Sequence, residues 1–213
     1  QTDHLPDDRQ VLAPSITWRP GDRTEITFLG LYQRDRTASS QQFLPVVSTL
    51  HASGRGPLDP STFLGDKDYD RLDARQASGT LLAEHRFNDT VALRSALRYL
   101  DADTTFQEIY PDTYSNPLDP FIDAERRVVN RNLYAIKPHI RTLTNDNSLQ
   151  FNFDTGAFNH TLLAGVDYTD FRQESSSAFC SAFSDPADCA VTPIDIYNPV
   201  SSGVVAPAYV EDP

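Results

Sequence analysis

The sequence predicts an all-β protein, an antiparallel meander of about six strands. Six segments alternate apolar and polar residues with a period of two, whereas the 3.6-residue period of an amphipathic helix is hard to find. The six segments fall into three pairs, each joined by a short turn. The connections between the pairs are long. This contrast between short turns and long connections limits which all-β architecture is possible.

Each predicted pair consists of two strands around a turn rich in Gly, Pro, Asn or Asp, the residues that antiparallel neighbours need at a reversal. In chain order the strands and their turns are 16–19 and 24–33 around Pro20-Gly21-Asp22, 77–87 and 91–99 around Asn88-Asp89-Thr90, and 148–154 and 161–168 around residues 155–159.

Three long connections separate or follow these hairpins, at about residues 37–73, 105–141 and 173 to the end. Compact soluble domains rarely carry structureless loops of this length. Short turns at one end and long loops at the other are the normal asymmetry of an outer-membrane β-barrel, and a β-sandwich has no reason to show it.

One face of each predicted strand is apolar, and aromatic residues stand at both ends of that face. Those just before the short turns are Trp18, Phe87 and Phe153, and those further along the strands after the turns are Tyr32, Tyr99 and Tyr168. Two such rings predict the aromatic girdles of a membrane barrel. The alternative is a soluble β-sandwich, whose core face is also apolar.

The composition excludes several classes of protein. The 213 residues carry 18 Lys and Arg against 30 Asp and Glu, a formal charge of −12 that repels a phosphate backbone, so no nucleic-acid partner is expected. No run approaches the ~18 apolar residues of a membrane helix, and no signal peptide is predicted.

Six strands are too few to close a bacterial barrel, so we expect residues 1–213 to be part of a larger one.

Several motifs, in order along most of the chain, resemble the barrel of TonB-dependent siderophore receptors, most of all those for ferric hydroxamates such as ferrichrome. They are Thr17-Trp18-Arg19-Pro20-Gly21-Asp22, Thr27-Phe28-Leu29, Phe43-Leu44-Pro45, Glu84-His85-Arg86-Phe87-Asn88-Asp89, Thr155-Gly156, His160-Thr161-Leu162-Leu163-Ala164-Gly165-Val166-Asp167-Tyr168 and Ile196-Tyr197-Asn198-Pro199-Val200.

The resemblance implies a fragment of a 22-stranded transmembrane barrel whose plug domain, signal peptide and remaining strands lie outside these residues. It implies a receptor and transporter of the bacterial outer membrane, which takes up a ferric siderophore. The implied partners are that siderophore, the TonB complex through the missing plug, and outer-membrane lipid. Iron would arrive with its ligand, so no cofactor is expected.

The resemblance also supplies candidate ligand contacts on the long loops. Phe43 stands where those receptors carry a loop tryptophan before Leu-Pro, and Gln41 stands where they carry a tyrosine. Tyr110 and Tyr114 lie in the next loop, where the family again presents tyrosines. Aromatic side chains raised above a barrel suit a compact iron chelate. The alternative, that they pack their own loop, stays open.

Cys180 and Cys189 are the only cysteines, and both fall in the last long loop. The oxidising compartment outside the inner membrane favours a disulfide over two free thiols. The residues around them lack the additional His or Cys of a metal site. Asp66, Asp68 and Asp70 alternate but lack the Gly and Glu of a calcium loop, so we expect a solvated, outward-facing charged loop there.

No catalytic constellation or metal site emerges from the sequence, so we expect no enzyme and no metal. Two hypotheses remain. The first is the outer-membrane siderophore receptor. The second is a secreted or surface β-sheet domain that recognises carbohydrate or protein through its long loops.

Overall fold

The computed structural model describes residues 3–39, 41–200 and 203–212, and within these residues it contains strands and no helix. Accordingly, no described helix is long and apolar enough to cross a membrane. The strands are β1 Asp7–Leu12, β2 Ser15–Gly21, β3 Thr24–Thr37, β4 Arg71–Arg86, β5 Val91–Pro111, β6 Val128–Val129, β7 Arg131–Ile136, β8 His139–Thr155, β9 Phe158–Glu174, β10 Ser176–Cys180, β11 Ile194–Asp195 and β12 Val210–Glu211.

The main sheet is an antiparallel meander of six long strands, three of which are interrupted once. β1 and β2 both pair with β3, and β7 and β8 both pair with β5. Pro14 and Pro138 stand at these two breaks, because proline has no N–H for the ladder. β10 continues β9 after Ser175 and pairs with β7. The six predicted strands and the fold class are therefore confirmed.

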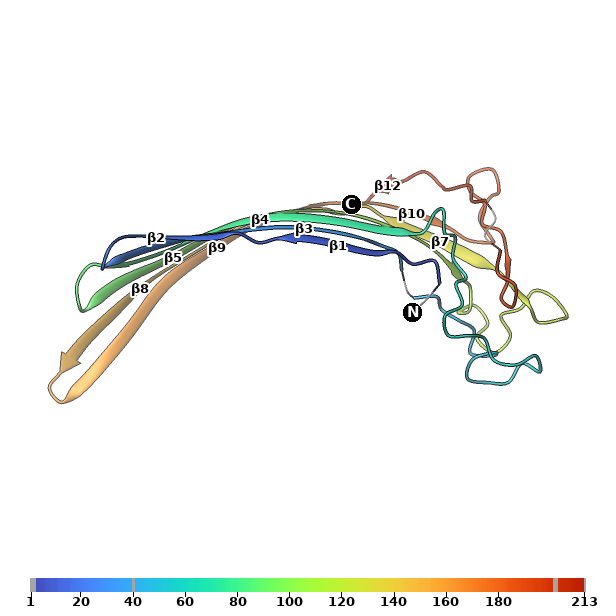
Figure 1. The fold of residues 1–213 in the computed structure, drawn as a ribbon, viewed down its shortest axis with the longest axis horizontal. Coiled ribbons are helices and arrows are strands. Elements are labelled where there is room, and N and C mark those ends of the chain that lie inside the picture. Colours follow the sequence, from blue (N-terminus) through green and yellow to red (C-terminus); the bar gives the residue numbers. More distant parts are fainter. Residues whose placement is uncertain (1–2, 40, 201–202, 213) are drawn as a thin grey trace.

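The three short turns also form as predicted. Asn88 closes the second turn, its Oδ1 accepting hydrogen bonds from the N–H groups of Thr90 and Val91 at 2.9 and 2.8 Å. The third turn is tighter than expected, because Thr155 pairs with Phe158 and leaves only two residues at the bend. One of these is Gly156, whose φ of 62° favours glycine. All three turns lie at one end of the sheet and the long loops at the other (Figure 1).

The predicted loop boundaries were partly wrong, since the strands run well beyond them. β5 reaches Pro111, and the stretch predicted as the second long loop contains β6 and β7. The last stretch contains β10, β11 and β12. The alternation of apolar and polar residues ends after Tyr99. The next two residues on the same face of the strand are Asp101 and Asp103, and aspartates are typical of loops in a sequence.

The strand register places the apolar and aromatic side chains on one face of the sheet and the polar side chains on the other. We call one the aromatic face, since it carries Trp18, Tyr32, Tyr99, Phe153 and Tyr168, all exposed. Phe87 follows β4 in the same alternation and its ring meets that of His85 edge-on at 4.7 Å. The other is the polar face, lined by residues such as Glu84, Arg94, Ser148 and Asp167.

The long loops pack together around two apolar clusters. One joins the ends of the strands to the last loop and includes Ile109, Leu133, Ala178 and the disulfide formed by Cys180 and Cys189. The other draws on three loops at once and consists of Leu58, Leu64, Val129, Ile194 and Ile196. We call the segments 41–70, 112–130 and 181–200 the loop body.

The sheet stays open among the described residues. β1 and β2 pair only with β3 at one edge, and β9 pairs only with β8 at the other. A barrel is therefore not closed by these strands alone.

Candidate ligand-binding site

The structure brings three of the four predicted ligand contacts together. The ring of Phe43 lies 5.3 Å from those of both Tyr110 and Tyr114, and the two tyrosine rings are 6.3 Å apart. Tyr110 comes from the end of β5, on the polar face, and Phe43 and Tyr114 come from two different loops. Such tilted and edge-on contacts are the favourable geometry for aromatic pairs.

Phe43 is held by its backbone and by the preceding residue. Its carbonyl accepts a hydrogen bond from Thr113 Oγ1 at 3.1 Å, and its φ is 43°. Gln42 is buried, and its Oε1 accepts hydrogen bonds from the N–H groups of Leu64 and Gly65 at 2.6 and 3.2 Å. The sequence analysis missed Gln42, because a glutamine in a polar loop gives no local sign of burial.

Gln41 stands apart from the aromatic cluster. It is exposed and lines a hollow of about 770 Å³ together with Ser39, Leu72 and Phe106. Leu72 and Phe106 both belong to the polar face of the sheet. The hollow therefore opens on the same face from which Tyr110 projects.

Glu108 adds a buried carboxyl group beside the aromatic cluster. It is 5% exposed, and its Oε1 has no hydrogen-bond partner among the described residues. Burial raises the pKa of Glu108, and a hydrogen bond from the Ser39 side chain opposes this rise. Sequence reasoning did not select Glu108, which reads as an ordinary polar position of a strand.

The electrostatic surroundings of the two tyrosines are negative. Burial raises the pKa of Tyr110 and of Tyr114, and the charges of Glu108 and Asp112 raise both further. Among the described residues, no Lys or Arg forms an ion pair with Glu108 or Asp112. The site therefore combines aromatic rings with uncompensated acidic groups.

The expectation of a solvated loop at Asp66, Asp68 and Asp70 was wrong for two of the three residues. Asp66 and Asp70 are buried, and only Asp68 is exposed. Asp70 Oδ1 accepts a hydrogen bond from the N–H of Ile109 at 2.8 Å, which fixes the loop to β5 next to Glu108. A Cβ on Gly65 would overlap Asp70 Oδ2, so the close approach requires glycine there.

Asp70 should make the stability of the loop body depend on pH. Burial raises the pKa of Asp70 from 3.8 to about 8. Between these values the folded loop keeps a proton that the unfolded loop releases, so the free energy of unfolding should fall as the pH rises from about 4 to about 8. Calorimetry of the full receptor at pH 5, 6.5 and 8 should show this decrease in the free energy of unfolding for the wild type, and a smaller decrease for Asp70→Asn. Equal decreases in the two proteins would show that Asp70 is not its cause.

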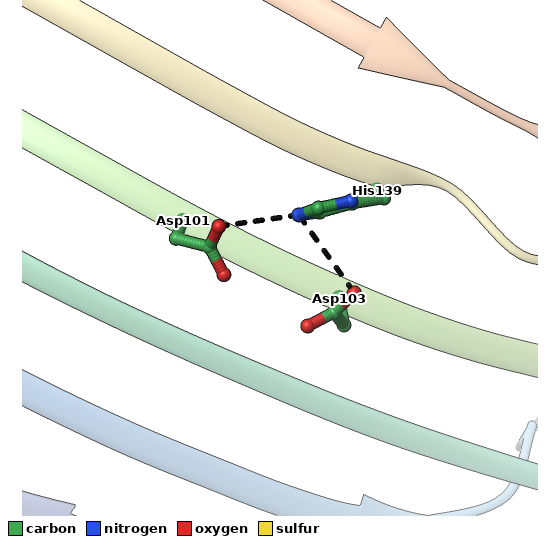
Figure 2. Close-up of side chains that lie close together, drawn as sticks. All are labelled: Asp101, Asp103 and His139. Atoms are coloured by element: carbon green, nitrogen blue, oxygen red, sulfur yellow. Dashed lines mark hydrogen bonds and ion pairs between the residues drawn. The ribbon is translucent and has the colours of Figure 1, made fainter.

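A second group of polar side chains lies on the aromatic face, beyond Tyr99. Nε2 of His139 is 3.2 Å from Oδ2 of Asp101 and 4.0 Å from Oδ1 of Asp103 (Figure 2). The pairing of β5 with β8 creates this group, which no sequence spacing reveals. Arg75 Nη2 also bonds Asp103 at 2.6 Å, so we describe the group as an ion-pair network that continues across the sheet.

An open meander with two aromatic rings on one face, and an aromatic, acidic site at the loop end of the other, defines a segment of a receptor-type outer-membrane barrel. The family model described as "TonB dependent receptor-like, beta-barrel" matches residues 17–212. The chain belongs to this family, whose members are bacterial outer-membrane receptors and transporters. This favours the first of the two hypotheses drawn from the sequence.

Curated relatives carry the same resemblance over a quarter of their length. The chain is 32% identical over 196 residues to the ferrioxamine B receptor of Salmonella typhimurium, covering 92% of this chain and 25% of that protein. It is 27% identical over 203 residues to the ferrichrome outer membrane transporter/phage receptor of Escherichia coli K12, covering 91% and 26%. The chain thus spans about a quarter of these relatives.

Solved structures agree on the fold. The ferric-catecholate import receptor Fiu of E. coli K12, in its open form, matches with a TM-score of 0.75 and 18% identity over 96% of this chain and 32% of that chain. The siderophore receptor PiuA of Acinetobacter baumannii matches with a TM-score of 0.72 and 19% identity over 97% of this chain and 31% of that chain.

Proposed function

We propose that the receptor containing this chain imports a ferric siderophore of the hydroxamate type across the outer membrane, energised through TonB. The family assignment and the ferrioxamine B and ferrichrome relatives support the siderophore and the dependence on TonB. We assign this segment no catalytic role, in line with a family of receptors and transporters.

The observation that carries the hydroxamate preference is the acidic and aromatic character of the site. Three hydroxamates neutralise one ferric ion, whereas three catecholates leave the complex strongly anionic. The carboxyl groups of Glu108 and Asp112 lie beside Tyr110 and Tyr114, and in the part of the chain that the structure describes no Lys or Arg pairs with them. Such a site repels an anionic chelate and accepts a neutral or cationic one.

In this proposal the aromatic cluster of Phe43, Tyr110 and Tyr114 contacts the chelate. The three rings come from separate segments of chain, so a ligand bound to them also holds the loops in place. Gln41 lines the neighbouring hollow and would contact only the edge of the ligand.

We further propose that the two aromatic rings mark the membrane boundaries, and the register supports this. Tyr32 shares its row of paired residues with Asp101, two residues beyond Tyr99, and Tyr99 shares its row with Asp170, two residues beyond Tyr168. The row of tyrosines therefore shifts by two residues along the strands, about 6.6 Å, for every two strand spacings across the sheet, about 9.6 Å. This is a strand tilt of about 35°, within the range of outer-membrane barrels.

Iron uptake by cells that carry the full receptor tests the proposal. Iron-starved cells with and without the gene, and with TonB coupling blocked, would be given a radiolabelled ferric hydroxamate or a ferric catecholate. We expect gene-dependent, TonB-dependent uptake of the hydroxamate alone. Uptake of the catecholate instead would overturn the ligand class, and uptake unaffected by TonB coupling would overturn the energy source.

A further inference from the structure

Three side chains of metal-ligating type meet on the aromatic face, in the group drawn in Figure 2. Asp101 and Asp103 are two residues apart on β5, so both point to the same side, and His139 begins the neighbouring strand β8. One ligand atom from each of the three lies within 4.8 Å of the other two. An imidazole nitrogen and two carboxylate oxygens therefore gather at one point of the sheet.

The separations of these atoms are close to those around a bound zinc ion. Zinc binds histidine nitrogen at about 2.0–2.1 Å and carboxylate oxygen at about 2.0–2.2 Å, so two ligand atoms of a tetrahedral site lie about 3.3–3.5 Å apart. Nε2 of His139 is already 3.2 Å from Oδ2 of Asp101. Oδ1 of Asp103 is 4.0 Å from the same nitrogen, and a small rotation of its side chain brings it into range.

The ion pair with Arg75 is compatible with a metal ligand at Asp103. Arg75 Nη2 bonds Oδ2 of Asp103 at 2.6 Å, whereas the oxygen that faces His139 is Oδ1. Carboxylates that bind a metal commonly have their second oxygen held by such an outer partner, which fixes their orientation. Arg75 therefore orients Asp103 and leaves one of its oxygens for an ion.

Asp101 has the fewest competing cations. Carboxylates beside it on this face have arginine partners, namely Asp73, Asp103, Asp170 and Glu174. Among the described ion pairs, that of Asp101 is with His139 and none is with Lys or Arg. Arg141 lies opposite Asp101 in the register, but its Nη2 bonds Oε1 of Glu174 at 2.9 Å. Asp101 is thus free to share a cation with His139.

The donor set favours zinc over calcium or magnesium. Those two ions prefer six or more oxygen ligands, whereas imidazole nitrogen suits Zn²⁺. A neutral imidazole binds a metal through Nε2 when Nδ1 carries the proton. The side chains of Asp101 and His139 are each 34% exposed, so an ion from solution reaches them and water can take a fourth position.

The group lies at an interruption of the sheet. Asp103 and His139 form the last pair between β5 and β8, and Pro138 separates β8 from β7. Asp101 and Asp103 lie about 7 and 13 Å beyond Tyr99 along the strand, outside the membrane boundaries proposed above. An ion bound here would join β5 to the start of β8 on the outer surface of the barrel.

We infer that Asp101, Asp103 and His139 bind one Zn²⁺ in a structural site that holds β5 and β8 together at this interruption. The sequence predicted no metal, because the three residues meet only through the pairing of β5 with β8. The site is on the face opposite the ligand-binding site and does not depend on which siderophore the receptor takes up.

Zinc binding by the full receptor in detergent tests the inference. The receptor would be stripped of metal with EDTA, dialysed, and titrated with radiolabelled Zn²⁺ by equilibrium dialysis. We expect His139→Gln and Asp101→Asn each to lower the zinc affinity of one site by about 10-fold or more. In the wild type, Zn²⁺ should also slow hydrogen exchange in residues 101–104 and 139–142, and in His139→Gln it should not.

The matched control for Asp101→Asn is Glu174→Gln. It removes one negative charge opposite His139 on the same face, and should change the zinc affinity by about 2-fold or less. His85→Gln removes a histidine of this face at the turn end, where Nδ1 lies 2.8 Å from Thr24 Oγ1, and should leave zinc binding unchanged. Circular dichroism of each variant would establish that its β-structure is retained.

Equal zinc binding by the wild type and His139→Gln would overturn the inference and leave the group as an ion-pair network only. Tighter binding of Ca²⁺ than of Zn²⁺ would also overturn it, because that preference excludes the imidazole as a ligand. Neither result would affect the proposed uptake of a ferric hydroxamate, which is measured separately.

Discussion

Leu81→Arg should strongly destabilise the receptor, whereas Leu82→Arg should change its stability little. The two leucines are neighbours on β4 with similar exposure, 43% and 38%, but they face opposite sides of the sheet. Leu81 pairs with Phe28 and Leu97 on the aromatic face, between the two rings. Leu82 lies on the polar face in a hollow with Glu25, Glu84 and Asp146.

The expected difference follows from the solvent on each side. An arginine facing hydrocarbon near the membrane midplane costs about 2–4 kcal/mol in outer-membrane barrels. An arginine at position 82 stays in a polar hollow that contains three carboxylates and one cation, Arg94, so we expect a change below about 1 kcal/mol. The free energy of unfolding in lipid vesicles and the amount of receptor assembled in the outer membrane would both be measured.

Leu162 and Leu163 repeat the comparison on β9, where Leu162 lies on the aromatic face and Leu163 on the polar face. The same ranking there would show that the effect belongs to the face and not to one site. Equal damage from the arginines at 81 and 82 would mean that the aromatic face does not contact lipid, and the membrane boundaries proposed above would have to be abandoned.

These comparisons depend on faces that the sequence already predicted, and the reason is that side-chain alternation is local. A strand alternates its faces whatever it pairs with, so Leu81 and Leu82 can be separated without knowing their neighbours. The residues of the aromatic cluster were identified in a different way. Phe43, Tyr110 and Tyr114 were selected by resemblance to a family, and only the structure shows that the three rings meet.

The residues that sequence reasoning missed are those whose role depends on distant segments meeting. Asp70 looks solvated because its neighbours are charged, yet β5 supplies the N–H that it binds. Gln42 and Glu108 are both buried, although each is an ordinary polar position in the sequence. The first residues of β4 and the last residues of β5 were missed for another reason. On the aromatic face, the residues of these segments just beyond the row of tyrosines are charged instead of apolar, so the alternation that marks a strand is lost.

Arg131 is the clearest case of such a residue, and its replacement should have the second large effect. It is fully buried at the start of β7 and has no ion pair among the described residues. Its guanidinium donates instead to the carbonyl oxygens of Thr192, Gly65 and Leu64 at 2.8, 2.9 and 3.3 Å, and to Thr192 Oγ1 at 3.1 Å. One side chain thereby joins the first and last loops to the sheet.

Arg131→Met should destabilise the loop body by about 3 kcal/mol or more. Methionine fills part of the volume but leaves the carbonyl groups of two loops buried without donors, each at a cost of about 1–3 kcal/mol. Arg131→Lys should recover only part of the loss, because one ammonium cannot reach both loops with the geometry of a planar guanidinium. Hydrogen exchange of the full receptor should show faster exchange in residues 58–66 and 190–197.

The consequence should extend to ligand binding. Gln42 bonds the N–H groups of Leu64 and Gly65, whose carbonyl groups bond Arg131, so loosening this segment also frees Phe43. We therefore expect Arg131→Met to weaken binding of the ferric hydroxamate to the full receptor. Arg172→Met, which removes an exposed ion pair with Asp170 on the aromatic face, is the matched control and should change neither exchange in the loops nor binding. Unchanged exchange in Arg131→Met would show that the apolar clusters alone hold the loop body together.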